Sequence, residues 1–192
     1  IEHHPKDTEA YGNLASLLLR KERAPEAVSL LEGLVKQRPD DPTAHLYLAR
    51  IVEVKGDLTA AEKHFQKAWK LAPKDSAIVV DLMRLYLKKK DPETALDFAE
   101  KVLTSDPSNS GVHEVYTRLL IERGRLEDAQ EQVRILETVR KSTSEIRRRL
   151  GLIYLDRGLT AEAEREFAAL LAHNPADAAA RYYYSVLLLR TD

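Results

Sequence analysis

The chain has 192 residues, and its 30 lysines and arginines nearly balance its 31 aspartates and glutamates, giving a formal net charge of −1. This balance argues against a general nucleic-acid-binding protein, which usually carries a net basic surface. The absence of cysteine excludes disulfides, thiolate metal sites and a cysteine nucleophile. No uncharged stretch is long enough to span a bilayer, so direct membrane insertion is not expected.

A period of 34 residues runs through the whole chain. An alanine column recurs at this spacing as Ala27, Ala61, Ala95, Ala129 and Ala163. A proline column keeps the same phase at Pro39, Pro73, Pro107 and Pro175, with Lys141 in the one vacant place. Further columns of small, large apolar and glycine residues share the register, which is the pattern of a repeat protein.

The period divides the chain into five complete units with a partial unit at each end. The complete units are residues 8–41, 42–75, 76–109, 110–143 and 144–177. Residues 1–7 have the phase of the end of an earlier repeat, because Pro5 lies 34 residues before Pro39. Residues 178–192 fit the first helix of a sixth repeat.

Each unit is predicted to form two antiparallel helices. In residues 42–75, apolar side chains recur every three or four residues in two runs, which is helical spacing. Gly56 and Asp57 separate the runs and predict a tight turn. Pro73 ends the second run, since proline cannot continue a helical hydrogen-bond ladder. The chain is therefore expected to be all-α.

These columns resemble the tetratricopeptide repeat family. The second unit carries the family pattern at Leu48, Ala49, Gly56, Ala61, Phe65, Ala68 and Pro73. The fifth unit carries it at Leu150, Gly151, Tyr154, Gly158, Ala163, Phe167 and Pro175. The resemblance implies an α-solenoid, a right-handed superhelix of stacked helix pairs whose first helices line a concave groove. It also implies a noncatalytic scaffold that binds an extended peptide or a helix, although the fold does not name the ligand.

The sequence departs from the family pattern at two positions. The aromatic residue that opens the pattern is Tyr11 in the first unit, but later units have other residues there: His45, Val79, His113 and Arg147. The fourth unit lacks its proline, and Ser142 with Glu145 could instead form a helix-capping pair at this junction.

One first-helix column that the resemblance places in the groove has arginine in three consecutive units: Arg50, Arg84 and Arg118. Arginine binds carboxylates through two parallel hydrogen bonds, so this column predicts an acidic peptide ligand. Neighbouring positions would add apolar contacts and one more charge: Leu46, Tyr47, Val80, Leu87, Ile121 and Arg148. The alternative is weak pairing within each helix, Arg50 with Glu53, Arg84 with Asp81, and Arg118 with Glu114 or Glu122. Such pairs can coexist with ligand binding.

No enzyme signature appears in the sequence: it has no glycine-rich phosphate loop, no metalloprotease histidine pair and no nucleophile elbow. His45 and His113 share a repeat position, but no third ligand recurs beside them, so they are expected to pack rather than bind metal. No catalytic residue, cofactor or metal is therefore predicted. The alternative function is a substrate-selecting segment of a larger enzyme whose catalytic domain lies outside this sequence.

The last helix is predicted to be apolar around most of its circumference. Tyr182, Tyr183, Val186 and Leu189 contribute to this surface. Terminal repeats normally present a polar outer face, and large exposed apolar patches are unusual on soluble monomers. Either the chain is cut from a longer array, or this helix mediates self-association or contacts a partner.

Overall fold

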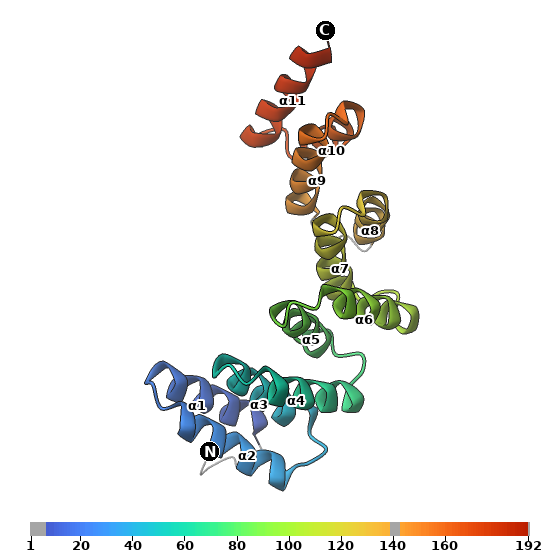
Figure 1. The fold of residues 1–192 in the computed structure, drawn as a ribbon. Coiled ribbons are helices and arrows are strands. Elements are labelled where there is room, and N and C mark those ends of the chain that lie inside the picture. Colours follow the sequence, from blue (N-terminus) through green and yellow to red (C-terminus); the bar gives the residue numbers. More distant parts are fainter. Residues whose placement is uncertain (1–6, 139–142, 192) are drawn as a thin grey trace. The chain divides into compact units, whose positions relative to one another are not determined.

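A computed structural model of the chain describes residues 7–138 and 143–191, and every regular element within these ranges is an α-helix (Figure 1). The described residues form eleven helices: α1 (Thr8–Arg20), α2 (Ala24–Gln37), α3 (Pro42–Val54), α4 (Leu58–Leu71), α5 (Ser76–Lys88), α6 (Pro92–Ser105), α7 (Ser110–Glu122), α8 (Leu126–Thr138), α9 (Ser144–Asp156), α10 (Thr160–His173) and α11 (Ala178–Thr191). Helices adjacent in sequence pack in pairs, as α1 does on α2 and α9 on α10. The predicted all-α solenoid of helix pairs is therefore confirmed.

The chain divides into two compact units. One extends to Val112 and contains α1 to α6 with the first residues of α7, and the other begins at His113. Each unit is described by itself below.

Aspartate side chains fix where most helices of the first unit begin. Each accepts a hydrogen bond from a backbone N–H in the first turn, which would otherwise have no partner within the helix. These capping residues are Asp7, Asp41, Asp57, Asp75 and Asp91. The caps before α1, α3 and α5 are 34 residues apart, so the repeat period sets the helix starts as well as the core.

The glycine column marks the turn between the two helices of a repeat. Gly56, Gly124 and Gly158 have φ values of 91°, 74° and 72°, in the left-handed region that glycine adopts at little cost. Glu22 and Lys90 occupy the same place with φ values of 59° and 61°. The turn geometry therefore persists where the glycine is absent.

The alanine column lies at the centre of the helix contacts. All five alanines are fully buried, namely Ala27, Ala61, Ala95, Ala129 and Ala163. Phe65 and Phe167 follow the alanine of their own repeat by four residues and are fully buried too. Gly151 shows how tight this packing is, because a Cβ built on it would lie 2.8 Å from the ring of Phe167. Small residues in these columns thus let neighbouring helices approach closely.

The junction between the fourth and fifth repeats lies partly outside the described residues. The expected capping contact between Ser142 and Glu145 involves residue 142, which lies outside the described residues. Glu145 contacts Arg148 through an ion pair of 2.7 Å. Thr143 immediately precedes α9 and makes no side-chain capping hydrogen bond.

Candidate functional site

In the first unit, Arg50 and Arg84 meet at one carboxylate. Arg50 Nε of α3 lies 2.6 Å from Asp81 Oδ2 of α5, and Arg84 Nη1 lies 3.7 Å from Asp81 Oδ1. Asp81 thus pairs with Arg84 as predicted but also links two repeats through Arg50. The predicted pairing of Arg50 with Glu53 is not found, because Glu53 contacts Lys88 instead at 3.2 Å. The two arginines therefore already share an acidic partner.

The apolar residues predicted beside these arginines differ in exposure. Leu46 is buried, with 7% of its surface exposed, so most of its side chain packs in the core. Leu46 lies on the side of α3 that faces neighbouring helices, and the 34-residue phase alone does not show this. Tyr47, Val80 and Leu87 are half-buried and remain partly accessible.

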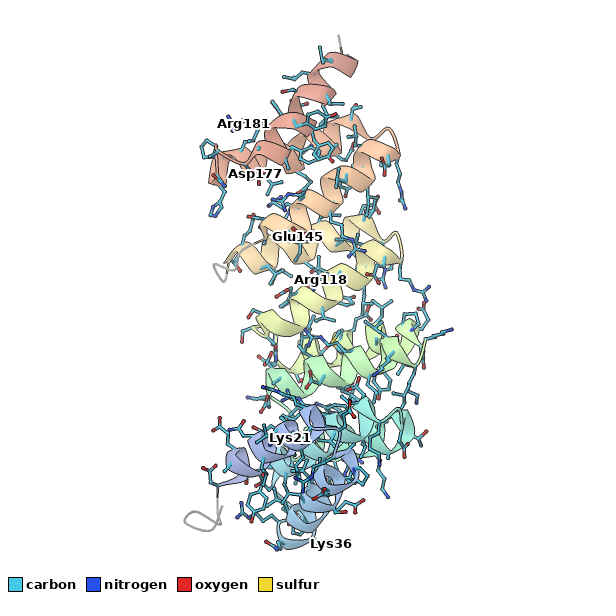
Figure 2. All side chains as sticks on the ribbon, turned by 90° about the vertical axis from the view of Figure 1, so that its left-hand side faces the viewer. Lys21, Lys36, Arg118, Glu145, Asp177 and Arg181 are labelled. Carbon is cyan, nitrogen blue, oxygen red and sulfur yellow. The ribbon has the colours of Figure 1, made fainter. Side chains whose placement is uncertain are left out.

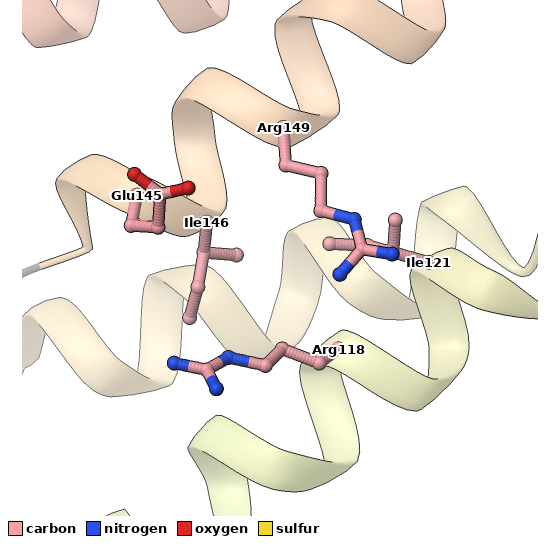
Figure 3. Close-up of a pocket in the computed structure, with 5 residues that line it drawn as sticks. All are labelled: Arg118, Ile121, Glu145, Ile146 and Arg149. Atoms are coloured by element: carbon pink, nitrogen blue, oxygen red, sulfur yellow. The ribbon is translucent and has the colours of Figure 1, made fainter.

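In the second unit, Arg118 lines a hollow between the first helices of two repeats. Arg118 and Ile121 come from α7, and Glu145, Ile146 and Arg149 come from α9. These five residues enclose about 240 Å³, and we call this space the α7–α9 hollow (Figure 3). Figure 2 places Arg118 and Glu145 on these neighbouring helices.

The α7–α9 hollow combines an apolar floor with charged walls. Ile121 and Ile146 are almost fully buried, with 3% and 4% of their surfaces exposed. The side chains of Arg118 and Arg149 extend into the space between the helices (Figure 3). Long arginine stems can cover apolar surface while the guanidinium groups stay in water.

Both arginines of the hollow carry solvent-exposed carboxylate partners. Arg118 Nη2 lies 2.6 Å from Glu114 Oε1, as predicted, and Arg149 Nη2 lies 3.1 Å from Glu122 Oε1. All four side chains are between 43% and 50% exposed. Exposed pairs of this kind contribute only about 0–1 kcal/mol each. A ligand carboxylate can therefore replace either partner at little cost.

Arg149, Ile146 and Glu145 were not predicted as site residues. Arg149 lies 102 residues after Tyr47, three periods of 34, so it shares a repeat position with a residue that was predicted. The repeat period in the sequence could therefore have identified Arg149 as a site residue. Ile146 occupies a column that is buried in other repeats, as Ile78 shows, and nothing in the sequence marks it as the floor of a hollow.

Arg148, also predicted in the groove, connects α9 to the start of α11. Its guanidinium lies 2.9 Å from Asp177 and 2.7 Å from Glu145. Asp177 also accepts a hydrogen bond from the backbone of Ala180, and this bond with the Arg148 contact lowers the pKa of the Asp177 carboxyl. Arg148 therefore has a structural role in helix stacking.

A buried ion pair occupies the position of the family aromatic in the fifth repeat. Arg147 Nη1 lies 2.6 Å from Glu166 Oε2 of α10, and the Glu166 side chain is only 5% exposed. Arg147 Nε also donates to Glu137 at 2.9 Å. Burial raises the pKa of the nearby Tyr154 hydroxyl to about 12, so this group stays protonated at neutral pH. The contacts of Arg147 join α9 to α8 and α10.

The predicted interface residues of α11 are exposed to different degrees. Tyr182 and Leu189 are 64% and 81% exposed. Tyr183 stacks on Phe167 with ring centroids 5.5 Å apart, and Val186 is half-buried. One side of α11 thus packs on α10 while Tyr182 and Leu189 face outward.

Two features are absent from the part of the chain that the structure describes. Within residues 7–138 and 143–191, no group of three or more histidine, aspartate or glutamate side chains is arranged to hold a metal ion. In the same part of the chain, no helix has the length and apolar character needed to cross a bilayer.

Models of the tetratricopeptide repeat family match most of the sequence. One matches residues 1–42, 12–76 and 148–192, and another matches residues 87–153. The chain belongs to the tetratricopeptide repeat family. Repeats of this family generally form protein-interaction scaffolds without catalysis of their own.

Relatives and solved structures extend this likeness. The chain is 29% identical over 189 residues to cellulose synthase operon protein C of Xanthomonas axonopodis pv. citri (strain 306), matching 90% of this chain but only 12% of that protein. The tetratricopeptide protein YrrB, described as having an unusual peptide-binding site, aligns with a TM-score of 0.63 at 18% identity. That alignment covers 95% of this chain and 94% of YrrB. A repeat protein from Parabacteroides merdae gives a TM-score of 0.68 at 21% identity, covering 95% and 72% of the two chains. These solved structures share the fold.

Proposed function

We propose that this chain is a scaffold that binds an extended, acidic polypeptide segment at the α7–α9 hollow. The observation that carries the proposal is the hollow itself, in which Arg118 and Arg149 flank a floor of Ile121 and Ile146. The general scaffold role of the family supports a polypeptide ligand. The peptide-binding site named for YrrB supports the same class of ligand.

The chemistry of the hollow specifies what the segment should contain. Its volume of about 240 Å³ suits one aliphatic side chain on the two isoleucines. A neighbouring aspartate or glutamate would form a bidentate pair with Arg118 or Arg149. Since both arginines are only about half-exposed, a ligand would remove much of their remaining contact with water. An apolar residue beside a carboxylate is therefore the expected recognition element.

A peptide array tests this ligand class. It would present leucine- or valine-centred segments flanked by Asp or Glu, each matched with the same segment carrying Asn or Gln. The acidic members should bind and their amide counterparts should bind more weakly. Equal binding of the acidic and amide sets would contradict the proposal that the hollow recognises a carboxylate.

Charge reversal tests the location. Replacing Arg118→Glu or Arg149→Glu should weaken an array-selected peptide by about 1.5–3 kcal/mol, roughly 10- to 150-fold, because a hydrogen bond to a charged group is lost. Arg134→Glu on α8 is the matched control, since Arg134 is an exposed arginine of the same unit with an i,i+3 partner in Glu131. A loss of the same size in all three variants would place the ligand elsewhere.

A second candidate is a substrate-selecting segment of a larger enzyme or enzyme complex. The cellulose synthase operon relative favours it, because the present chain corresponds to only a small part of that protein. The full-length protein with Arg118→Glu distinguishes the candidates. A selecting segment should lose kcat/KM for its substrate, whereas a scaffold should lose a bound partner without a change in turnover.

A further inference from the structure

Two junctions between repeats can be compared position by position, because the repeat period relates them. The α7–α9 hollow lies between the first helices of the fourth and fifth repeats, and Arg118 and Arg149 are two of the residues that line it. Two periods of 34 residues earlier in the sequence, the same positions hold Arg50 and Asp81. These residues lie on α3 and α5, the first helices of the second and third repeats. The α3–α5 junction therefore shows what this pair of positions does elsewhere in the chain.

At the α3–α5 junction the two positions form an ion pair. Arg50 Nε lies 2.6 Å from Asp81 Oδ2, and the Asp81 side chain is only 16% exposed. Arg84 Nη1 lies 3.7 Å from the other oxygen, Asp81 Oδ1. One sheltered carboxylate at this repeat position is thus shared by two arginines.

At the α7–α9 junction a second arginine replaces this carboxylate. Arg118 keeps the arginine of the first position, and Arg149 stands where Asp81 would be. A neighbouring carboxylate is lost as well, since Ile121 takes the place of Glu53. The two arginines extend from opposite helices into the space between them (Figure 3). Like charges on two sides of a hollow repel each other, and an anion between them turns this repulsion into attraction.

The carboxylates that pair with the two arginines in the structure lie in more open surroundings. Glu114 pairs with Arg118 and Glu122 pairs with Arg149, and both glutamates come from α7. Their side chains are 46% and 50% exposed, about three times the value for Asp81. Pairs as exposed as these contribute only about 0–1 kcal/mol. They therefore compete weakly with a carboxylate placed inside the hollow.

We propose that one side-chain carboxylate of the ligand takes the place in the hollow that Asp81 has at the α3–α5 junction, and that it binds Arg118 and Arg149 together. This inference rests on the proposed function and adds to it the group that the hollow recognises, a single carboxylate shared by two arginines. A carboxylate has two oxygens with about four acceptor sites, so two guanidinium groups can donate to it at once. The aliphatic residue beside it would then lie on Ile121 and Ile146.

A peptide with only one carboxylate tests the sharing. The array-selected peptide is prepared with blocked termini and with all but one of its acidic residues changed to the amide, and its partner peptide has the last one changed as well. Calorimetry compares the parent with Arg118→Gln and Arg149→Gln. Both variants should bind the one-carboxylate peptide at least about tenfold more weakly than the parent does, and should bind the amide peptide as the parent does. Arg134→Gln, at an exposed arginine of α8, should match the parent with both peptides.

The outcomes separate this inference from the proposed function. A one-carboxylate peptide that is weakened by only one of the two variants would show that each arginine binds its own carboxylate, which overturns the inference and leaves the proposed function standing. A peptide that is weakened by neither variant would overturn both. A third peptide has the amide side chain but a free terminal carboxylate. If it bound as tightly as the acidic peptide, the hollow would recognise a chain end, and the inference would again be wrong.

A second test needs no ligand. Arg149→Asp places in the hollow the carboxylate that Asp81 supplies at the other junction, and Arg149→Asn is its uncharged control of the same shape. The thermal unfolding midpoint of the Asp variant, relative to that of the Asn variant, should be higher in the parent than in proteins that also carry Arg118→Gln, because the partner is then missing. The Asp variant should also bind the acidic peptide more weakly than the Asn variant. An equal difference in midpoint in both backgrounds would show that a carboxylate at position 149 does not meet Arg118, and would overturn the proposal.

Discussion

Glycine has opposite effects at two helical positions of this chain, depending on what lies beside it. Gly151 of α9 abuts the fully buried ring of Phe167, and a Cβ there would lie 2.8 Å from that ring. Gly33 lies inside α2, and a Cβ there would meet nothing within 4 Å. The close packing of the helices therefore requires glycine at position 151, whereas position 33 has space for a Cβ.

Alanine at these two positions should change stability in opposite directions. Gly151→Ala should lower the free energy of unfolding by about 1–3 kcal/mol through overpacking, which exceeds the helix-propensity gain. Gly33→Ala should raise it by about 0.5–1 kcal/mol, because only the propensity gain remains. Urea unfolding of both variants measures the difference. Stabilisation by Gly151→Ala would show that the packing at Phe167 is looser than described.

His64 should make the stability of the second repeat depend on pH. Burial first, then the nearby charges of His45 and Lys63, lowers its folded-state pKa below the usual value of 6.5, and Glu32 opposes the shift. The unfolded chain therefore binds more protons in this range, and stability falls as the pH decreases below 6.5. His64→Gln should reduce this slope below about pH 6.5. An unchanged slope would assign the pH dependence to other groups.

At the scale of helices, α10 begins without the side-chain cap that α4 and α6 have. Asp57 and Asp91 cap α4 and α6, but the equivalent Leu159 before α10 makes no side-chain hydrogen bond. The backbone angles of Leu159 (φ −82°, ψ 70°) are close to those of Asp57 (φ −82°, ψ 79°). The backbone is already suited to an aspartate cap.

Leu159→Asp should therefore stabilise the protein. We expect the free energy of unfolding to rise by about 0.5–2 kcal/mol, because an N-terminal N–H of α10 gains a partner. Leu159→Ala removes the same exposed leucine without adding a cap and serves as the control. The thermal unfolding midpoint of Leu159→Asp should be higher than that of Leu159→Ala. Equal midpoints would mean that solvent already satisfies this helix end.

The helices were predictable from sequence, but several side-chain contacts were not. The 34-residue columns located the turn at Gly56 and the buried alanines, because repeat phase determines local backbone and packing. The alternative pairing of Arg50 with Glu53 on its own helix is not formed, and Arg50 instead reaches Asp81 on α5, since a long side chain can contact several neighbours in space. The meeting of His45 with His64 likewise depends on how the two helices fold back, which spacing along one helix does not show.

At the scale of the whole molecule, α11 carries more exposed large apolar side chains than any other described helix, namely Tyr182, Leu188 and Leu189. Tyr182 and Leu189 face outward on this helix. We propose that the chain self-associates weakly through these residues, because burial of apolar surface is favourable. Tyr182→Ser combined with Leu189→Ser should lower the average mass at high protein concentration, as measured by light scattering. Leu17→Ser, at another exposed leucine on α1, is the control. A parent chain that is monomeric throughout would contradict the proposal.

The central claim is that a polypeptide ligand occupies the α7–α9 hollow, and isoleucine methyl NMR tests it most directly. Ile121 and Ile146 form the floor of the hollow, whereas Ile51 and Ile78 lie in the core of the other unit and serve as internal references. On addition of an array-selected acidic peptide, the methyl signals of Ile121 and Ile146 should shift, and Arg118→Glu should abolish the shifts at the same peptide concentration. Saturable peptide binding that leaves both signals unmoved would contradict the claim.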